Sequence, residues 1–449
     1  MKQRFYKIDN LSSSNFLSLF KKPSDLDDLL ADKDVSKIIS RAQEEYLPWQ
    51  KFKNKDLSLQ KKKKIWGVVK LQRSLAAKST IIRDEGGRRF TFNPRSYVQF
   101  LHEIDLELGG SFMGKSGFDD GDRSQFIRRN LIEESIASSQ LEGANTSRKV
   151  AKAMLEESRK PKNKSEQMIV NNHEAMKWIE EDLKNKEMSI ENIKNLHRKI
   201  TFNTIDECYQ GKIRETLDEK GEPLVITPWD DDVITYRAPN KEFVEKELKK
   251  FIEFANDKDD EGFIHPLIKA IMLHFWIGLL HPFEDGNGRL ARIIFYWYML
   301  RKDYWAFSHL SISERILKSS KQYSMAYIYS EQDDNDLNYF IHYNISKIKL
   351  ARKNFAEYMI KVSGENRKIS QKVKDDCGFN SRQMRLLQSI AKGEQDHTSI
   401  TMYRNANEDI SKLTAISDLK KLVEGGFFTK VKRGRNVYYR PTDKVTGLL

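Results

Sequence analysis

Two apolar runs near the middle of the chain enclose a short and strongly polar stretch. The first run covers residues 271–280, the second covers residues 293–300, and the polar dozen between them is His281–Arg292. Each run is long enough for a buried helix and lacks the alternation of a half-buried strand. Pro282 disfavours a helical conformation at the residue before it. The pattern therefore predicts a tight polar loop held between two buried helices.

The glycines and arginines of this loop suit a polyphosphate. Gly286 and Gly288 can adopt positive φ, which lets backbone N–H groups converge on an anion. Arg289 and Arg292 lie three residues apart at the start of the next helix, so they share one face beside its positive end. The sequence therefore predicts a phosphate-binding turn at the start of the second helix.

Three further side chains complete the loop. Asp285 is a hard oxygen ligand of the kind that holds the Mg²⁺ accompanying a polyphosphate. His281 carries an imidazole that can be neutral near pH 7 and can therefore accept a proton. Phe283 is an aromatic residue inside a polar loop, and we expect it to anchor the loop in the core. A loop that merely caps two helices would not need a base, an acid and two arginines together.

The same twelve residues match, at every defined position, the H-x-F-x-D/E-G-N-G-R-x-x-R signature of the Fic family. This resemblance implies an adenylyltransferase that moves AMP from ATP, with Mg²⁺, to a Ser, Thr or Tyr hydroxyl of a target protein. It implies His281 as the general base and Asp285 as the metal ligand. The ATP-binding residues that it implies are Asp285, Gly286, Asn287, Gly288, Arg289, Arg292 and Tyr323.

Tyr323 enters this set through residues 321–327, which resemble the segment that closes over adenine in the Fic family. The family often has two adjacent tyrosines there, whereas Tyr323 is followed by Ser324 in this chain. The strictness of any preference for adenine is therefore left open. His274, inside the first apolar run, is expected to be a core histidine and not a ligand.

A second motif lies upstream, at the end of a helix predicted over residues 124–141. Ser138, Glu142 and Gly143 fit the pattern S/T-x-x-x-E-G/N, and Gly143 can end the helix in a left-handed conformation. The motif resembles the inhibitory helix of the Fic family, whose glutamate pairs with the second arginine of the signature. A carboxylate on Arg292 would form a pair worth roughly 1.5–3 kcal/mol and would repel the γ-phosphate. We therefore expect an autoinhibited enzyme.

Two β-rich runs, residues 224–227 and 233–236, are joined by a polar turn and predict a hairpin. The hairpin resembles the flap of the Fic family, which positions the target peptide by strand pairing. An exposed hairpin edge offers the backbone groups that such pairing needs, although an inert surface hairpin is the alternative. The flap residues expected to meet the target are Val225, Ile226, Thr227, Ile234 and Thr235.

The end of the chain, residues 368–449, has two or three predicted helices followed by a basic β-hairpin and resembles a winged-helix domain. No cluster of arginine or asparagine marks a base-reading surface on the helix predicted over residues 410–423. A protein-interaction or structural role is therefore favoured, and DNA binding stays open. The cations that would contact DNA phosphates are Lys412, Lys420, Lys421, Lys432, Arg433 and Arg435.

Composition limits the cellular compartments and the classes of binding partner that we expect. The chain has no run of 18 apolar residues that could span a membrane, and its start lacks the apolar region of a signal peptide. Cys208 and Cys377 fit neither a metal knuckle nor a disulfide framework, so a reducing cytoplasm is expected. The net charge of +13 favours nucleotide phosphates, nucleic acid or an acidic protein without choosing among them.

We therefore expect a mostly α protein, with a Fic-type helical domain, a β-hairpin flap and an α+β winged-helix domain. The expected parts are a mainly helical region at residues 1–95, a catalytic domain at 96–360 with its inhibitory helix at 124–143, a polar linker at 361–367 and the winged-helix-like domain at 368–449. Self-modification and a homodimer are compatible with the resemblance. Alternative activities are AMP removal from a modified protein, transfer of UMP, phosphate or phosphocholine, and DNA-binding regulation beside a vestigial catalytic domain.

Overall fold

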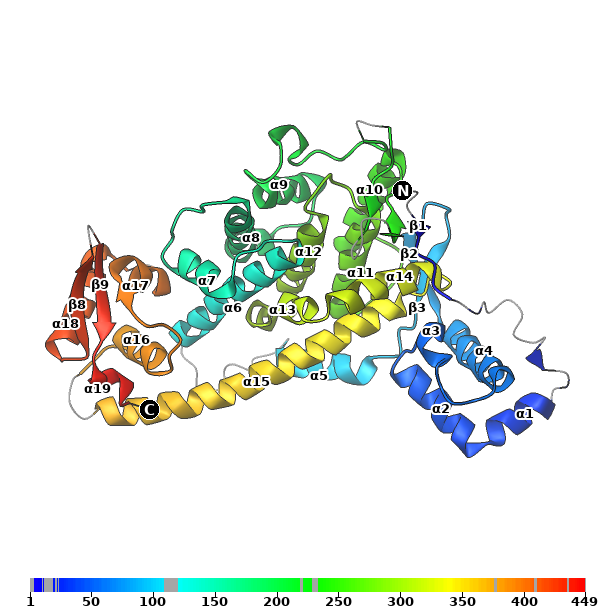
Figure 1. Cartoon of the computed structure of the whole chain (residues 1–449), viewed down its shortest axis with the longest axis horizontal. Coiled ribbons are helices and arrows are strands. Elements are labelled where there is room, and N and C mark those ends of the chain that lie inside the picture. Colours follow the sequence, from blue (N-terminus) through cyan, green and yellow to red (C-terminus); the bar gives the residue numbers. More distant parts are fainter. Residues whose placement is uncertain are drawn as a thin grey trace. The chain divides into compact units, whose positions relative to one another are not determined.

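The computed structural model is dominated by helices, as the sequence predicts (Figure 1). No helix in the described ranges is both long and apolar enough to cross a membrane. The chain divides into two compact units: the first comprises Met1–Leu106, Ile179–Tyr304 and Ile316–Lys347, and the second comprises Glu107–Trp178, Trp305–Arg315 and Ile348–Leu449. The structure describes residues 4–9, 11, 19–20, 22, 24–108, 120–218, 221–227, 233–374, 378–407, 410–433 and 436–448.

The N-terminal part of the first unit is a helical cluster followed by a hairpin. The helices bury Trp49, Phe52 and Trp66 against one another, with ring centroids 5.2 to 6.2 Å apart. The two strands of the hairpin pair antiparallel. The elements are α1 (Ser24–Ala31), α2 (Lys33–Glu44), α3 (Trp49–Phe52), α4 (Leu59–Ala76), β2 (Lys78–Arg83) and β3 (Arg89–Phe92).

Two helices at the centre of the first unit, α11 (Pro266–Leu280) and α12 (Asn287–Arg301), pack directly against each other (Figure 1). Pro266 stands at the first turn of α11, and the His265 side chain accepts a hydrogen bond from the Leu267 N–H at 3.1 Å, so this helix start is capped. Both helices are buried almost all round, which is the pattern of a core helix. The prediction of two buried helices around a polar loop is therefore confirmed.

The other elements of the first unit surround this pair. They are β1 (Arg4–Phe5), α5 (Val98–Leu108), η4 (Leu183–Asn185), α9 (Ile190–Thr201), η5 (Glu207–Tyr209), β4 (Val225–Ile226), β5 (Val233–Ile234), β6 (Tyr236–Arg237), α10 (Lys241–Ala255) and α14 (Ser320–Gln332). Phe251 and Phe254 of α10 meet Trp276 of α11 edge to face, at centroid distances of 5.6 and 6.0 Å. Helix α10 therefore covers one side of the central helix.

The second unit joins a helical part to a small α/β tail. Its elements are α6 (Asp120–Leu141), α7 (Arg148–Glu156), α8 (Lys164–Glu181), η6 (Trp305–His309), α13 (Ile312–Leu317), α15 (Asn338–Lys374), α16 (Ser381–Ala391), β7 (Thr398–Ser399), α17 (Ile400–Ala406), α18 (Lys412–Glu424), β8 (Phe428–Arg433), β9 (Asn436–Pro441) and α19 (Asp443–Thr446). Some of these helices continue into the first unit.

The tail packs around a hydrophobic core that includes Leu387, Leu419 and Phe428, and a buried carboxylate, Asp418, links its helices. Strands β7, β9 and β8 form an antiparallel sheet in that order, which adds a third strand to the predicted hairpin. Asp418 on α18 accepts hydrogen bonds from the Asn380 Nδ2, the Arg382 Nε and the Tyr403 hydroxyl at 2.8, 2.8 and 3.1 Å. Because these donors come from α17 and from the start of α16, Asp418 fixes three helices together.

Residues 361–367 were predicted as a linker, and this prediction is wrong because they lie inside helix α15. Val362 is buried there, and Lys361 and Glu365 form an i,i+4 pair at 3.8 Å. A run of charged residues has the same composition in a linker and on the solvated face of a helix. Composition alone therefore could not separate the two.

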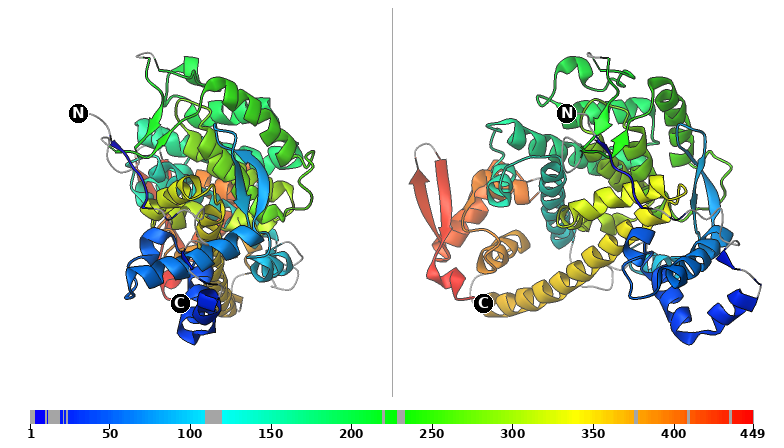
Figure 2. Two further views of the ribbon diagram at one scale, coloured as in Figure 1. Left: turned by 90° about the vertical axis from the view of Figure 1, so that its right-hand side faces the viewer. Right: turned by 45° about the vertical axis from the view of Figure 1, so that its right-hand side comes forward.

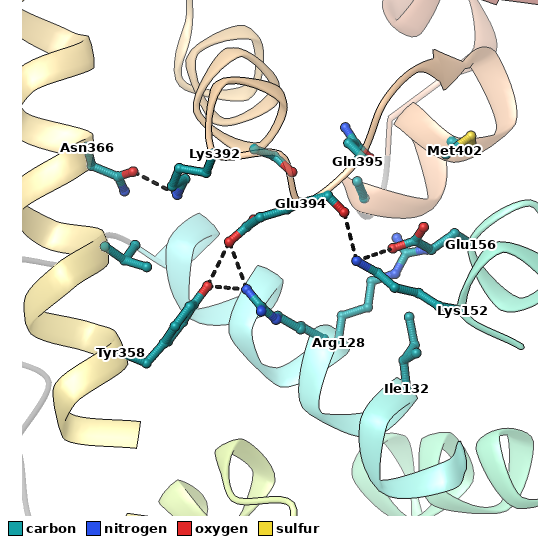
Figure 3. A pocket seen from close by; sticks show the side chains of 14 residues that line it. Arg128, Ile132, Lys152, Glu156, Tyr358, Asn366, Lys392, Glu394, Gln395 and Met402 are labelled. Carbon is teal, nitrogen blue, oxygen red and sulfur yellow. Dashed lines mark hydrogen bonds and ion pairs between the residues drawn. The ribbon is translucent and has the colours of Figure 1, made fainter. Parts of the chain in front are cut away.

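A polar junction joins the tail to α6 and α7 within the second unit (Figure 3). The Glu394 carboxylate accepts hydrogen bonds from Arg129 on α6 at 2.8 Å and from the Tyr358 hydroxyl on α15 at 2.9 Å. Its main-chain oxygen accepts a hydrogen bond from the Lys152 Nζ on α7 at 2.9 Å. These groups line a cavity of about 90 Å³. The helix that carries the predicted inhibitory motif is thus tied to the tail by side chains around one glutamate.

Gly278 allows α14 to pack closely on α11 in the first unit. A Cβ atom at this position would lie 2.4 Å from the Tyr327 hydroxyl oxygen and 2.8 Å from two ring carbons. The Tyr327 ring also stacks on Phe275 at a centroid distance of 5.2 Å, so it cannot easily withdraw. This position therefore requires glycine.

We expect Gly278→Ala to destabilise the protein by about 1–3 kcal/mol, because the added methyl group overpacks this contact. Gly364→Ala is the matched control, since an added Cβ at this exposed helical position meets nothing within 4 Å. The control should stabilise α15 by roughly 0.5–1 kcal/mol. Thermal unfolding followed by circular dichroism measures both changes, and equal midpoints for the two variants would contradict the packing argument.

Candidate active site

The loop between α11 and α12 is a tight turn with a left-handed residue at each end. His281 caps α11 with φ 46° and ψ 58°, and its N–H donates to the Ile277 oxygen at 2.9 Å. Gly286 precedes α12 with φ 86°, as predicted. Gly288 was expected to share this conformation but lies inside the first turn of α12. A non-glycine residue in the left-handed region is costly, so the surrounding structure must hold His281 in place.

Asn287 closes the loop on itself. Its Oδ1 accepts a hydrogen bond from the Phe283 N–H at 3.0 Å, and its Nδ2 donates to the Phe283 oxygen at 2.7 Å. Phe283 is buried, which confirms the prediction that it anchors the loop in the core. The Asn287 amide was predicted to serve a nucleotide. In the structure its two polar atoms shape the loop.

Asp285 lies just before α12, and Arg289 lies in the first turn of this helix. Arg289 is fully buried and donates from Nη1 to the Ile200 oxygen on α9 at 2.8 Å. Its Nη2 lies 3.6 Å from the Asp285 Oδ2, and the Asp285 side chain is 46% exposed. Arg292 is also largely buried on α12. The structure thus brings two arginines and one accessible carboxylate to the helix start that the sequence singled out.

His197 on α9 supports the loop and was not predicted. Its Nδ1 accepts a hydrogen bond from the Gly211 N–H at 2.9 Å, so the proton lies on Nε2, which donates to the Asp285 oxygen at 2.7 Å. Its ring stacks on Phe283 at a centroid distance of 3.8 Å. Burial lowers the pKa of His197 to about 4. The sequence offers only a histidine among apolar and basic residues, which does not reveal its partners.

Arg214 is a second support that sequence reasoning missed. It donates from Nε to the His281 oxygen at 2.7 Å and from Nη2 to the Pro239 oxygen at 2.6 Å. Its main-chain N–H donates to the Pro282 oxygen at 3.0 Å. Burial lowers the pKa of this guanidinium. Arg214 therefore holds the backbone on both sides of the His281–Pro282 peptide.

Tyr323 lies on α14 and is linked to α11 through His274. The Tyr323 hydroxyl and the His274 Nε2 are 2.7 Å apart, and Tyr323 also packs against Phe340 and Tyr343. His274 is buried, so its prediction as a core histidine is confirmed. Burial, followed by the nearby Arg292 cation, lowers the pKa of His274 to about 3. Tyr323 thus belongs to an aromatic wall of the first unit.

The predicted hairpin forms, and its pairing is antiparallel between β4 and β6. The N–H and the hydroxyl of Thr235 both donate to the Ile226 oxygen, at 2.8 and 2.9 Å. Ile234 and Thr235 are buried, whereas Val225, Ile226 and Thr227 are half-buried. The turn at residues 228–232 lies outside the described residues. Among these five residues, the side chains of the first strand and of the residue after it are therefore the more accessible.

The predicted inhibitory motif lies in the second unit, at the end of α6. Gly143 has φ 89°, and the N–H groups of Gly143 and Ala144 return to the Gln140 and Ser139 oxygens, so the predicted left-handed helix stop is confirmed. Ser138 is buried and Glu142 is half-buried. The pairing of Glu142 with Arg292 remains a prediction.

The lysines of the tail differ in their local partners. Lys420 pairs with Glu424 at 3.4 Å, and the Lys421 Nζ donates to the Gly378 oxygen at 2.6 Å. Lys412 and Lys432 are exposed. The side chains of Arg433 and Arg435, and Cys377, lie outside the described residues. The two lysines near the end of α18 therefore have local partners that a nucleic acid would have to replace.

His197 should make the stability of the protein depend on pH. Its folded pKa of about 4 lies below the ordinary value of 6.5, so the unfolded chain binds a proton that the folded chain rejects between these values. Its contribution is full above pH 6.5 and is lost as the pH falls toward 4, by roughly 3 kcal/mol. Urea unfolding of His197→Gln should lose less stability between pH 7 and pH 4.5 than the wild type does.

The exposed His102 provides the control, and His102→Gln should keep the wild-type dependence on pH. Equal dependence in the wild type and His197→Gln would show that His197 titrates freely in the folded protein.

Solved structures of several Fic proteins resemble the chain. One is a Fic family protein from Desulfovibrio desulfuricans, with a TM-score of 0.47 and 17% identity, covering 78% of this chain and 95% of that protein. Another is a fragment of Fic-1 from Caenorhabditis elegans, with a TM-score of 0.45 and 20% identity, covering 59% of this chain and 71% of that one.

Curated relatives align with part of the chain. Protein adenylyltransferase fic-1 of Caenorhabditis elegans is 31% identical over 118 residues, which are 26% of this chain and 20% of that protein. Protein adenylyltransferase Fic of Nematostella vectensis is 29% identical over 123 residues, or 27% and 25% of the two chains. The chain thus spans about a quarter or less of these relatives. Residues 187–299, which include the loop described above, match the model of the Fic/DOC family.

Proposed function

We propose that the chain transfers AMP from ATP to a Ser, Thr or Tyr hydroxyl of a target protein. A bond forms between the hydroxyl oxygen and the α-phosphorus, the bond from that phosphorus to the bridging oxygen breaks, and pyrophosphate leaves. The observation that carries the proposal is the pairing of a rigidly held His281 with an arginine-bearing helix start only a few residues later. The names of the aligned relatives support the same activity.

His281 serves as the general base of this reaction. It takes the proton of the attacking hydroxyl as the new bond forms, which requires the neutral imidazole. The hydrogen bonds of Arg214 to the His281 and Pro282 oxygens hold the backbone from which the imidazole projects. Arg214 is therefore a positioning residue, because it acts through His281 and not on the substrate.

The start of α12 binds the phosphates. The backbone N–H groups at Gly286, Asn287 and Gly288 lie at the positive end of this helix, where an anion is stabilised. Arg292 contacts the γ-phosphate, and Arg289 adds positive charge while bracing Asp285. Tyr323 belongs to the aromatic wall against which the adenine ring of ATP stacks.

Asp285 fits a Mg²⁺ ion that arrives with the nucleotide. Its carboxylate is half exposed, and Mg²⁺ is commonly bound by one or two carboxylates together with substrate phosphates and water. Among the described residues, no group of three or more His, Cys, Asp or Glu side chains is arranged to hold a metal. When bound, Mg²⁺ offsets the charge that develops on the leaving pyrophosphate.

We further propose that Glu142 inhibits the reaction by pairing with Arg292. The carboxylate would pair with the Arg292 guanidinium that the γ-phosphate needs. ATP would then bind only in an orientation unsuited to transfer. The left-handed stop at Gly143 supports this role, because it fixes the end of the helix that carries Glu142. The flap would receive the target, and self-modification follows when no target is present.

The tail acts as a winged-helix-like domain that recruits a protein partner or a second copy of the chain. This role is preferred to DNA binding because Lys420 and Lys421 have local partners. The proposed compartment is the cytoplasm, on the basis of cysteine usage in the sequence alone.

Glu142→Gly should raise the incorporation of labelled AMP into the chain itself, by about ten-fold or more if the lost pair is worth the roughly 1.5–3 kcal/mol of a charged hydrogen bond. The double variant Glu142→Gly/His281→Ala should lose transfer while keeping ATP binding, because only the base is removed. Incorporation measured by autoradiography and ATP binding measured by calorimetry give the two readouts.

Equal incorporation by the wild type and Glu142→Gly would contradict inhibition, and transfer by the double variant would contradict the role of His281. Release of AMP from a modified protein, without incorporation, would instead indicate the reverse activity.

A further inference from the structure

The N-terminal strand of the chain is paired with the flap. Strand β1 runs parallel to β5, with Arg4 opposite Val233 and Phe5 opposite Ile234. The dark blue strand β1 is seen beside the green hairpin in the right-hand view of Figure 2. The Tyr6 N–H donates to the Ile234 oxygen at 2.7 Å. Nothing in the sequence of this short segment predicts a strand or its partner. The structure thus joins the first described residues of the chain to a hairpin more than two hundred positions away.

This pairing uses the edge of the flap that faces away from β4. Successive residues of a strand direct their backbone groups to opposite edges. The Thr235 N–H bonds to the Ile226 oxygen beside β4, whereas the preceding residue, Ile234, accepts from Tyr6. The second side of the hairpin, residues 233–237 with β5 and β6, is therefore paired along both edges. Strand β4 pairs with one edge, and the chain's own N-terminal segment, which we define as residues 4–9, pairs with the other.

The N-terminal segment is also held by a second element, helix α14. Gln332, at the end of α14, donates from Nε2 to the Tyr6 oxygen and accepts from the Ile8 N–H, each at 2.9 Å. Ile8 packs against the buried cluster of Tyr46, Tyr329 and Tyr339. The side-chain amide of Gln332 thus binds the C=O of Tyr6 and the N–H of Ile8, two residues apart in the segment. The segment is seated in a specific place.

We infer that the N-terminal segment occupies the strand edge on which an extended segment of the target docks, and that it competes with the target for this edge. The inference rests on the proposed function, since it assigns regulation to the flap of that enzyme. Its partner is an extended polypeptide whose backbone replaces the hydrogen bonds of β1 to β5. Glu142 and the N-terminal segment would then restrain different substrates, the nucleotide and the target protein.

The structure favours a displaceable competitor. Strand β1 has only two residues, and the Phe5 side chain remains 42% exposed, so the pairing buries little apolar surface. The firmer anchors lie beyond the strand, at Gln332 and Ile8. A target could therefore displace the paired residues while the rest of the segment stays attached.

The test uses the full chain and a fluorescent synthetic peptide with the sequence of residues 4–9. Tyr6→Pro removes the N–H that donates to Ile234, whereas the control Tyr6→Ala keeps this N–H and removes the side chain. Freeing the edge should raise peptide affinity about ten-fold or more in Tyr6→Pro, because self-occupancy no longer reduces the binding-competent fraction. Tyr6→Ala should stay close to the wild type in fluorescence anisotropy.

A second variant covers the case in which the N-terminal segment of Tyr6→Pro stays in place through its contacts with Gln332. Tyr6→Pro/Gln332→Ala also removes the two hydrogen bonds of Gln332. The inference is overturned if neither variant binds the peptide more tightly than Tyr6→Ala, or if the wild type already binds it as tightly as they do.

A third measurement separates this inference from the proposed function. In a Glu142→Gly background, Tyr6→Pro should raise the labelling of added proteins with AMP above that of Tyr6→Ala. If Glu142→Gly itself transfers no AMP, the proposed function fails, and the peptide measurement still decides whether the edge is self-occupied.

Discussion

The loop of the candidate active site depends on buried polar groups that fix its backbone from outside. A turn with His281 in the left-handed region is not stable by local preference, because a side chain in that conformation is strained. Arg214 binds the oxygens of His281 and Pro282, and His197 binds the oxygen of Asp285. In a buried site such bonds are expensive to leave unmade, so they define one geometry. The positions of the proposed general base and of the phosphate site are therefore set by side chains that need not touch the substrate.

The two proposed restraints act at different levels. The carboxylate of Glu142 would oppose the nucleotide by charge, whereas the strand at residues 4–5 would oppose the target by occupying backbone hydrogen-bonding groups. Charge pairing responds to ionic strength, and strand pairing responds to a competing extended chain. The junction around Glu394 ties α6, the helix that directly precedes Glu142, to the tail. The two restraints together would let one chain respond to both a nucleotide and a protein.

Local sequence signals carried much of the fold and of the candidate site. Apolar runs located the two central helices, turn and helix-stop signals located the left-handed glycines Gly286 and Gly143, and β-rich runs located the antiparallel hairpin. The reason is that helix burial, helix stops and hairpins are set by residues close together in the chain. Residues 361–367 show the limit of this reasoning, because a solvated helix and a linker share one composition.

The sequence by itself determined which residues could carry the chemistry, since His281, Asp285 and Arg292 have the required acid–base and charge properties wherever they lie. Only the tertiary structure decided what holds them. His197 and Asp285 are 88 positions apart, and Arg214 and His281 are 67 apart. A buried histidine or arginine reveals that it needs partners, but not which carbonyl supplies them, because that choice is made when distant elements pack together.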